Sequence, residues 1–223
     1  MSADRYFVLG LDLDGTCADF YGRMREIASE WTATPLDELD EEPTWDLRNW
    51  GIGEANYPRF HRFAVTQREL FSSMKPLPGA PQAIRRLGTE GIRIRIITHR
   101  LFIPYFHQTA VTQTVQWLDH HGLPYWDLCF MREKGDVGAD LYVEDSPRNI
   151  SELKELGKEV IVLSNATNRE LSDTSLQRAS DWSEAERLIR ERYYQWLNDR
   201  HYELPPGIGI EPSWAKTADR PVA

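Results

Sequence analysis

The sequence predicts an α/β fold in which helices flank a parallel β-sheet. Short apolar runs, which suit buried strands, alternate along the chain with segments of helical periodicity. Several of these helical segments are followed by a glycine (Gly91, Gly122 and Gly157), and glycine commonly ends a helix. Strands that alternate with helices imply a parallel sheet with right-handed crossovers.

The expected elements follow one another in a regular order. Strands are expected at 7–11, 92–97, 127–131, 141–143 and 160–163. Helices are expected at 81–90, 109–120, 151–156 and 183–197. The runs at 7–11 and 160–163 are continuously apolar, which is typical of strands covered on both faces.

Residues 17–75 differ in character from the rest of the chain. They are rich in aromatic and charged residues, and their helical patterns are broken by residues such as Pro35, Pro43 and Pro58. We interpret this segment as a helical insertion after the first strand, with the turn-forming segment 76–80 as the return into the core. The α/β core then comprises 1–16 and 76–198, and an irregular C-terminal tail is expected at 199–223.

Composition narrows the classes of function. The net charge of −9 argues against binding a nucleic-acid polymer, because such binding relies on Lys and Arg that neutralise phosphates. A small phosphorylated substrate remains compatible with this charge, since a local cation or a metal can reverse the sign of the field. The chain shows no membrane span or signal peptide. Its two cysteines, Cys17 and Cys129, are expected to be reduced thiols, so a cytoplasmic location is expected.

Polar side chains follow three of the predicted strands. Asp12 and Asp14 come after the first strand, Thr98 after the second, and Glu144 and Asp145 after the fourth. In parallel sheets ligands bind beyond the carboxyl ends of the strands, so these side chains are expected to meet at one edge. This convergence predicts a functional site.

The residue types at this edge suit phosphoryl transfer. A carboxylate at a strand end can attack phosphorus, and Asp12 is the candidate nucleophile. Asp14 can protonate the leaving oxygen and then activate water. Asp145 and Glu144 supply the oxygen ligands that Mg²⁺ prefers.

Other residues are candidates for holding the phosphate. Thr98 can donate its hydroxyl, and Lys134 can supply positive charge. Main-chain N–H groups near Asp14, Gly15 and His99 can complete an anion-binding nest. Each candidate also has a plain structural interpretation: Thr98 as a helix cap, Lys134 as a solvated loop lysine and His99 as a structural histidine.

The segment Asp12-Leu13-Asp14-Gly15-Thr16 resembles the first motif of the haloacid dehalogenase (HAD) superfamily. Thr98 resembles the second motif, Lys134 the third and 143–146 the fourth, in the same order over roughly residues 5–165. Within this superfamily the chain is most similar to the 5′(3′)-deoxyribonucleotidases. The segments that carry this likeness are 14–20, 76–80, 134–141 and Asp181-Trp182.

The resemblance implies a HAD-like Rossmannoid core, a small helical cap formed by the insertion after the first strand at 17–75, and a Mg²⁺-dependent phosphomonoesterase that acts on a nucleoside monophosphate. It implies that Mg²⁺ is held by Asp12, the main-chain carbonyl of Asp14 and Asp145, with Glu144 binding the metal through water or orienting its ligands. It also implies that aromatic residues enclose the base, at positions matched by Phe20 and Trp45, with Trp50 as a neighbour. His99 and Ser146 depart from the Ser and Arg that the family often has.

Several alternatives remain open on the sequence. The substrate could be a sugar phosphate or another small phosphoester, and the chain could be a phospho-ligand-binding protein without turnover. The cap aromatics, Trp31 and Tyr57 included, could simply form the interior of the cap. The protein could be a monomer or a homodimer.

Overall fold

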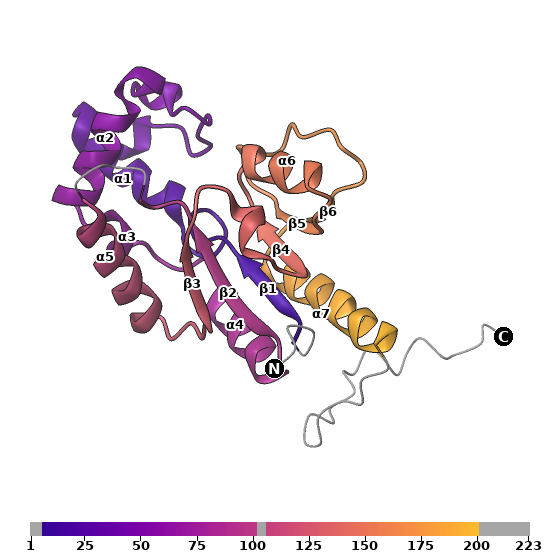
Figure 1. Cartoon of the computed structure of the whole chain (residues 1–223). Coiled ribbons are helices and arrows are strands. Elements are labelled where there is room, and N and C mark those ends of the chain that lie inside the picture. Colours follow the sequence, from indigo (N-terminus) through magenta and orange to yellow (C-terminus); the bar gives the residue numbers. More distant parts are fainter. Residues whose placement is uncertain (1–5, 102–105, 201–223) are drawn as a thin grey trace.

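A parallel β-sheet forms the centre of the protein (Figure 1). The computed structural model describes residues 6–101 and 106–200. Within those ranges the sheet has six strands in the order β3-β2-β1-β4-β5-β6, and every pairing is parallel. The strands are β1 (Val8–Leu11), β2 (Arg93–Thr98), β3 (Asp127–Phe130), β4 (Leu141–Glu144), β5 (Val160–Leu163) and β6 (Gln177–Ala179).

The pairing register aligns the carboxyl ends of the central strands. Leu11, the last residue of β1, pairs with Ile96 of β2 on one side and with Val143 of β4 on the other. The chain therefore leaves β1, β2 and β4 at the same edge of the sheet. This alignment confirms the predicted fold class and brings together the polar residues that follow these strands.

The sequence did not predict β6. Gln177–Ala179 is only three residues long, and of these only Ala179 is buried. It pairs with β5 at the edge of the sheet, where one side of a strand needs no partner. A short and largely polar strand lacks the apolar run from which strands are recognised in a sequence.

Helices cover both faces of the sheet, and two hydrophobic clusters fill the space beneath them. The larger cluster joins strand residues such as Leu11 and Ile94 to Trp182 and Ile189. The smaller one packs Val162 against the helix that covers the other face of the sheet, which contributes Ile150 and Leu153. The core helices are α4 (Ala80–Thr89), α5 (His107–His120), α6 (Pro147–Glu155) and α7 (Trp182–Asp199).

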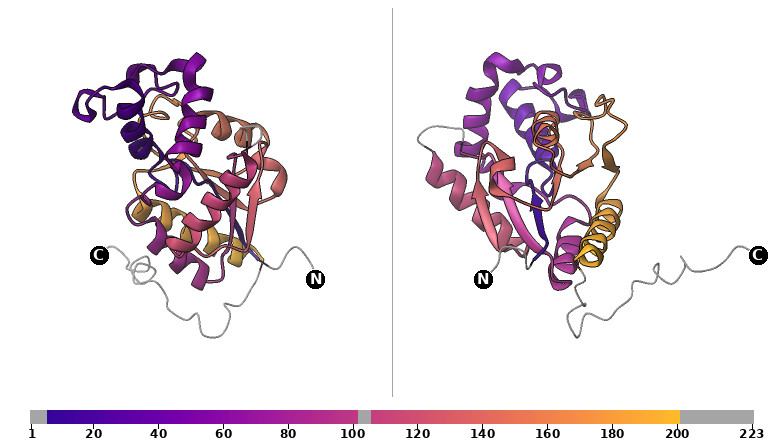
Figure 2. Two further views of the ribbon diagram at one scale, coloured as in Figure 1. Left: turned by 90° about the vertical axis from the view of Figure 1, so that its left-hand side faces the viewer. Right: turned by 45° about the vertical axis from the view of Figure 1, so that its right-hand side comes forward.

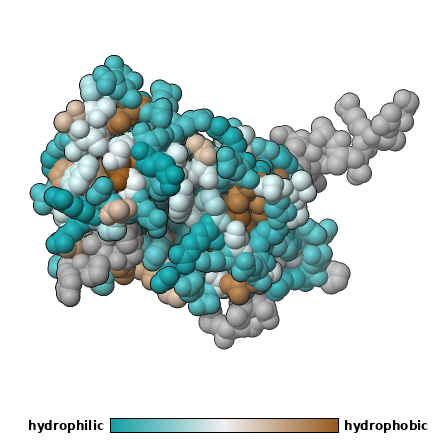
Figure 3. Space-filling model, turned by 90° about the horizontal axis from the view of Figure 1, so that it is seen from above, coloured by the Kyte–Doolittle hydropathy of each residue, from teal (hydrophilic) through white to brown (hydrophobic). Residues whose placement is uncertain are grey.

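The helices of residues 20–73 lie over the carboxyl edge of the sheet (Figures 1 and 2). They are α1 (Phe20–Thr32), α2 (Gly53–Gln67) and α3 (Leu70–Ser73), with short 3₁₀ turns η2 (Leu36–Glu38) and η3 (Arg48–Trp50) between α1 and α2. The break expected at Pro58 does not occur, because α2 continues through it. Seen from above, this end of the molecule is mostly hydrophilic, with small and separate apolar patches (Figure 3).

The two connections between these helices and the core run side by side. The N–H of Asp19 donates to the carbonyl of Lys75 at 2.8 Å, and the N–H of Leu77 donates to the carbonyl of Cys17 at 2.8 Å. These bonds form a short antiparallel bridge between the outgoing and the returning chain. The chain therefore passes between the core and the upper helices through one hydrogen-bonded crossing, and the upper helices also contact α5, where Gln113 accepts from the N–H of Phe71 and donates to the carbonyl of Val65.

Two further expectations concern the ends of the chain and the membrane. The predicted tail at 199–223 lies almost wholly outside the described residues, although Asp199 is the last residue of α7. Among the described helices, none combines the length and the apolar character needed to cross a bilayer. Cys17 and Cys129 are both free.

Candidate active site

Asp12 and Lys134 form a buried ion pair at the end of β1. The Asp12 side chain is only 7% exposed, and the Lys134 ammonium donates to its Oδ1 at 2.5 Å. Lys134 begins the 3₁₀ helix η4 (Lys134–Val137) and also donates to Glu144 Oε2 at 2.6 Å. One buried cation is thus shared between two carboxylates that arrive from neighbouring strands.

Asp145 brings a third carboxylate to the same place. Ligand oxygens of Asp12, Glu144 and Asp145 all lie within 4.8 Å of one another. Burial raises the pKa of Asp12 to about 7, although the Lys134 ammonium opposes this rise. Burial, followed by the charges of Glu144 and Asp12, raises the pKa of Asp145 well above its usual value. Three buried acids with one ammonium carry excess negative charge, which a divalent cation would balance.

Hydrogen bonds separate the roles of the two acids that follow β4. Glu144 Oε1 accepts from the N–H groups of Asp145 and Ser146, while its Oε2 accepts from Lys134. Both of its oxygens are therefore engaged, which suits an orienting role. Asp145 accepts from Thr16 Oγ1 at 3.2 Å and from Asn165 Nδ2 at 2.7 Å, two neutral donors that fix the direction of its carboxylate.

Gly15 is required by close packing. Its φ of +84° lies in the left-handed region, and a Cβ at this position would fall 2.2 Å from Asp145 Oδ2. The N–H of Gly15 donates to the carbonyl of Ala18 at 3.0 Å. The turn already uses this donor, so the phosphate contact expected of the Gly15 N–H stays a prediction without support from this geometry. Gly15 allows Asp145 to approach β1.

Thr98 and His99 end β2 beside these acids. The Thr98 hydroxyl is fully buried and has no hydrogen-bond partner among the described residues, so it remains available to a ligand. His99 lines the cavity above the acids. Partial burial, and then the nearby charges of Arg132 and Lys134, lowers the pKa of His99, which favours the neutral imidazole.

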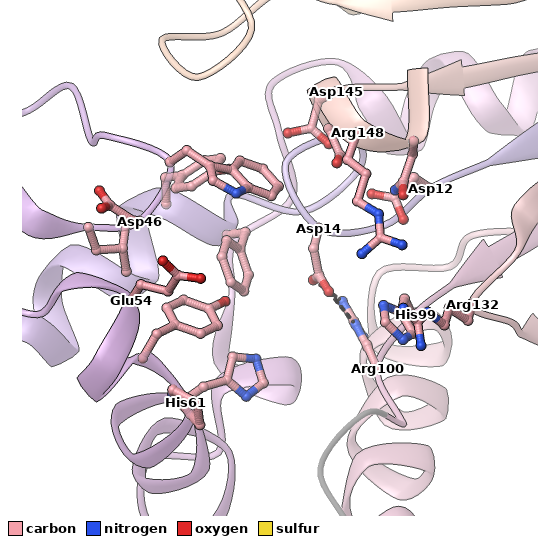
Figure 4. Close-up of a pocket in the computed structure, with 18 of the residues that line it drawn as sticks. Asp12, Asp14, Asp46, Glu54, His61, His99, Arg100, Arg132, Asp145 and Arg148 are labelled. Carbon is pink, nitrogen blue, oxygen red and sulfur yellow. Dashed lines mark hydrogen bonds and ion pairs between the residues drawn. The ribbon is translucent and has the colours of Figure 1, made fainter. Parts of the chain in front are cut away.

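Asp14 makes a contact that the sequence did not predict. Arg100 Nε donates to its Oδ2 at 3.0 Å and Arg100 Nη2 to its Oδ1 at 2.6 Å. Figure 4 shows the Asp14 and Arg100 side chains joined by these bonds on the same wall of the cavity. The only signal in the sequence was a cation two residues after Thr98.

A cavity of about 780 Å³ lies between the acids and the upper helices (Figure 4). Its upper wall includes Phe20, Tyr21, Trp45, Tyr57 and Phe71, together with the polar residues Asp46, Glu54 and His61. Its lower wall includes Asp12, Asp14, Lys134 and Asp145 and the cationic residues Arg100, Arg132 and Arg148. The size is that of a small-molecule site, with an aromatic side opposite a charged one.

The aromatic residues singled out in the sequence have different locations. Phe20 and Trp45 both line the cavity, and Trp45 is 55% exposed. Trp50 does not line it: the ring is 2% exposed, and its Nε1 donates to the carbonyl of Asp40 at 2.9 Å. The prediction of substrate contact for Trp50 is wrong, because this ring packs in the interior of the upper helices.

Comparison with known proteins agrees with this geometry. The sequence model of the family "5′ nucleotidase, deoxy (Pyrimidine), cytosolic type C protein" matches residues 6–194. The chain belongs to this 5′-nucleotidase family. A protein of Chlorobaculum tepidum with the name "Putative 5′(3′)-deoxyribonucleotidase" is 59% identical over 184 residues, which cover 82% of this chain and 90% of that protein.

Solved structures show the same fold at much lower identity. A haloacid dehalogenase-like hydrolase of Streptococcus pneumoniae superposes with a TM-score of 0.57 at 10% identity, over 82% of this chain and 98% of its own. The crystal structure of a predicted phosphatase from Clostridium acetobutylicum superposes with a TM-score of 0.59 at 13% identity, over 83% of this chain and 99% of its own. The chain is thus a HAD-fold, deoxyribonucleotidase-like phosphoric monoester hydrolase of the 5′-nucleotidase family.

Proposed function

We propose that the protein hydrolyses a nucleoside monophosphate through an aspartyl-phosphate intermediate on Asp12, with Mg²⁺ as cofactor. One observation carries the proposal. Asp12 lies at the end of β1, paired with Lys134 and close to Asp145, beneath a cavity whose opposite wall is aromatic. A carboxylate nucleophile, a cation and an acidic metal cluster are the components that phosphoryl transfer to a carboxylate needs.

The first half-reaction forms the phosphoenzyme. An oxygen of Asp12 attacks phosphorus, and the bond between phosphorus and the sugar oxygen breaks. Asp14 donates a proton to that oxygen, so the nucleoside leaves as an alcohol. Lys134 balances the negative charge next to the reacting group. We assign to the buried Thr98 hydroxyl, which has no partner among the described residues, a hydrogen bond to a phosphate oxygen.

The second half-reaction regenerates Asp12. Asp14, now ionised, accepts a proton from water as the water oxygen attacks phosphorus. The bond between Asp12 and phosphorus breaks, and inorganic phosphate leaves with the oxygen that water supplied. His99 remains neutral at the cavity wall, so we assign it contact with the substrate and no proton transfer.

The donor set fits Mg²⁺. Asp12 and Asp145 offer carboxylate oxygens, and the carbonyl of Asp14 is the third candidate ligand. Glu144 is tied to Lys134 and to two N–H groups, so it orients the cluster. When bound, Mg²⁺ would neutralise charge between the nucleophile and the phosphoryl group.

The upper wall of the cavity supports a nucleotide as the substrate. Phe20 is nearly buried and Trp45 is open to the cavity, so one ring is fixed while the other presents a free surface. Aromatic faces of this kind stack on nucleobases. The matching family carries the words "deoxy (Pyrimidine)" in its description, which supports a small phosphorylated nucleoside in this place.

The chain organisation follows from the same site. We propose that 17–75 is the cap and that 1–16 with 76–198 is the catalytic core, because the hydrogen-bonded crossing near Cys17 and Leu77 separates them. Closure of the cap over the acids would exclude water and select the substrate. A cytoplasmic location is in keeping with the "cytosolic type" of the family description.

A phosphate-release screen tests the proposal. Nucleoside 5′- and 3′-monophosphates, sugar phosphates and p-nitrophenyl phosphate would be compared with Mg²⁺ and with a chelator. Nucleotides should be hydrolysed best, and chelator should abolish activity. Greater activity on sugar phosphates would contradict the nucleotide assignment while leaving the chemistry in place.

Asp12→Asn tests the nucleophile in the same assay. The substitution should lower kcat by at least about 10³-fold, since it removes the group that bonds to phosphorus. Asp173→Asn is a matched control, because Asp173 is a surface carboxylate paired only with groups near α6. Persistent Mg²⁺-dependent turnover by Asp12→Asn would refute the aspartyl-phosphate mechanism.

A further inference from the structure

Asp14 and Arg100 form a second ion pair on the cavity wall, beside the pair of Asp12 and Lys134. Arg100 is the second residue after β2 and is 2% exposed, while the Asp14 side chain keeps 23% of its surface accessible. Both residues line the cavity. Two parallel N–H···O bonds between a guanidinium and a carboxylate fix the distance and also the plane of the carboxylate.

Arg100 is itself held on its remaining sides. Its Nη1 donates to Thr114 Oγ1 at 3.0 Å, and Thr114 belongs to α5. The guanidinium lies over the ring of Phe71 in α3, with 4.4 Å between the Arg100 Cζ and the ring centroid. Contacts from α5 and α3 therefore restrain the fork that Arg100 presents to Asp14.

A purely structural role is the competing explanation. Buried arginines are usually paired, and such pairs often do no more than satisfy a buried charge. The protein contains pairs of that kind: Arg190 bonds Glu90 and Glu186 between α4 and α7, and none of the three lines the cavity. Arg100 differs because its partner is the group to which the proposed function assigns proton transfer.

Proton transfer depends strongly on the placement of the acid. General acid catalysis needs the donor within hydrogen-bond reach of the leaving oxygen, and a small displacement costs a large part of the effect. Asp14 lies in the turn after β1, and without a partner its side chain could rotate about χ1 and χ2. The rigid contact with Arg100 removes that freedom and gives the carboxyl group a single orientation on the cavity wall.

We propose that Arg100 is the positioning residue for Asp14. This inference rests on the proposed function and deepens it. Arg100 bonds both oxygens of the Asp14 carboxyl group. The proton is exchanged at the second lone-pair direction of one of these oxygens, which faces the leaving sugar oxygen and, later, the attacking water. Arg100 touches neither the phosphoryl group nor the nucleophile, and it acts only through Asp14.

A comparison of two leaving groups tests the proposal. A sugar alkoxide must be protonated as it leaves, whereas p-nitrophenolate leaves without a proton. The constant kcat/KM reports the steps up to departure of the leaving group, so the first half-reaction is measured alone. Arg100→Gln should lower kcat/KM for the best nucleotide by about 10- to 100-fold and for p-nitrophenyl phosphate by less than about 3-fold.

Two further variants add an intermediate substitution at Arg100 and a control substitution away from the cavity. Arg100→Lys keeps the charge and most of the volume but cannot bond both oxygens in parallel, so its loss on the nucleotide should be intermediate. Arg190→Gln removes a paired arginine far from the cavity. It should change thermal stability, with the ratio of the two kcat/KM values unaltered. Arg100→Lys also serves as the test variant if Arg100→Gln does not fold.

A double-mutant cycle separates action through Asp14 from any other action. In the Asp14→Asn background, the further change Arg100→Gln should leave kcat/KM for the nucleotide unchanged within about 2-fold. A substantial further loss in that background would overturn the proposal. Equal losses on the two substrates in the single Arg100 variants would overturn it as well.

The Asp12→Asn variant keeps the two proposals distinguishable. If Asp12→Asn were active, the proposed mechanism would fail before Arg100 is considered. If Asp12→Asn were inactive, Asp14→Asn kept only a small residual activity on the nucleotide, and the Arg100 variants showed no dependence on the leaving group, only the positioning role would fail.

Discussion

The two walls of the cavity are built on different physical principles. On the core side, the charged groups that follow β1 and β4 are buried and joined by short bonds such as those from Lys134 to Asp12 and Glu144. On the opposite side, formed by the segment that we propose as the cap (17–75), aromatic rings meet the cavity, and one of them, Trp45, is more than half exposed. Buried charge fixes geometry, whereas an exposed ring can adjust to its ligand.

This contrast indicates a division of work. The core wall has little freedom, because displacing any of its charges would leave another charge buried without a partner. It suits a reaction whose atoms must be held in fixed positions. The wall on the cap side presents aromatic rings rather than buried ion pairs, and it offers a surface for selecting the substrate. Changes to the core wall should therefore affect folding and chemistry, and changes to the cap wall should affect binding.

The largest effect is expected at the centre of the core wall. Lys134→Met removes the only ammonium among three buried carboxylates, Asp12, Glu144 and Asp145. The free energy of unfolding in chelator should fall by about 3–5 kcal/mol, measured by denaturant titration. Added Mg²⁺ should restore more stability to the variant than it adds to the unaltered protein, because the metal replaces part of the lost charge.

A surface lysine gives the matched comparison. Lys154 pairs with Asp173, and both side chains are a third or more exposed. Lys154→Met should therefore cost less than about 1 kcal/mol, since exposed ion pairs contribute little. A loss for Lys134→Met no larger than that for Lys154→Met would remove the basis for treating the core wall as a buried charge network.

The next effect compares two tryptophans within the cap. Trp50→Phe should lower the free energy of unfolding by about 1–3 kcal/mol, through the lost volume and the lost bond to the Asp40 carbonyl, and leave KM within about 2-fold. Trp45→Ala should do the reverse: KM for nucleotides should rise about 5- to 30-fold, equivalent to ~1–2 kcal/mol, with little change in stability.

The substrate again supplies the control for Trp45. If the ring stacks on a nucleobase, its removal should raise KM for nucleotides much more than for p-nitrophenyl phosphate. Equal increases for both substrates would count against base recognition. They would assign Trp45 to a general function in closing the cavity.

The smallest effect per pH unit is a pH dependence located at His61 in α2. His61 in α2 is fully buried beside Phe20, Tyr57 and Phe71, and this burial lowers its pKa to about 4, partly opposed by the charge of Asp14. In the unfolded chain the pKa is 6.5, so between pH 6.5 and 4 only the unfolded state takes up the proton. Stability should therefore fall with decreasing pH in this window, by at most ~1.4 kcal/mol per pH unit.

His61→Phe isolates this contribution. The variant keeps an aromatic ring among aromatic neighbours and has no proton to bind, so its stability should decline less steeply below pH 6.5. Unfolding by denaturant at pH 7, 6 and 5 would give the two slopes. Equal slopes of unfolding free energy against pH in the two proteins would show that His61 binds a proton as readily in the folded state as in the unfolded state.

Much of this architecture could be predicted from the sequence, because short segments of the chain carry the patterns that indicate it. Apolar runs such as 160–163 predict buried strands, and carboxylates directly after such runs, as at Asp12 and Asp145, predict a site at the edge of a parallel sheet. The strand β6 escaped prediction because an edge strand of three residues has no apolar run to mark it.

Other features depended on contacts between distant segments. The N–H of Gly15 is used within its own turn, yet the need for glycine arises from Asp145, far along the chain. Trp45 and Trp50 lie only five residues apart, and the resemblance separated them only as a matched position and its neighbour; the packing of the upper helices turns Trp45 to the cavity and Trp50 to the interior. Composition and periodicity carry no information about such directions.

By itself, the sequence determined the fold class and the set of groups that can perform phosphoryl chemistry, because strand periodicity and residue type are properties of short segments. Only the tertiary structure decided how Asp14 is held, since Arg100 lies 86 residues away from it and is itself restrained by Thr114 and Phe71. An ion pair across such a separation forms when two strand ends meet. Its partners are therefore chosen by the register of the sheet and the packing of α5 and α3 against it.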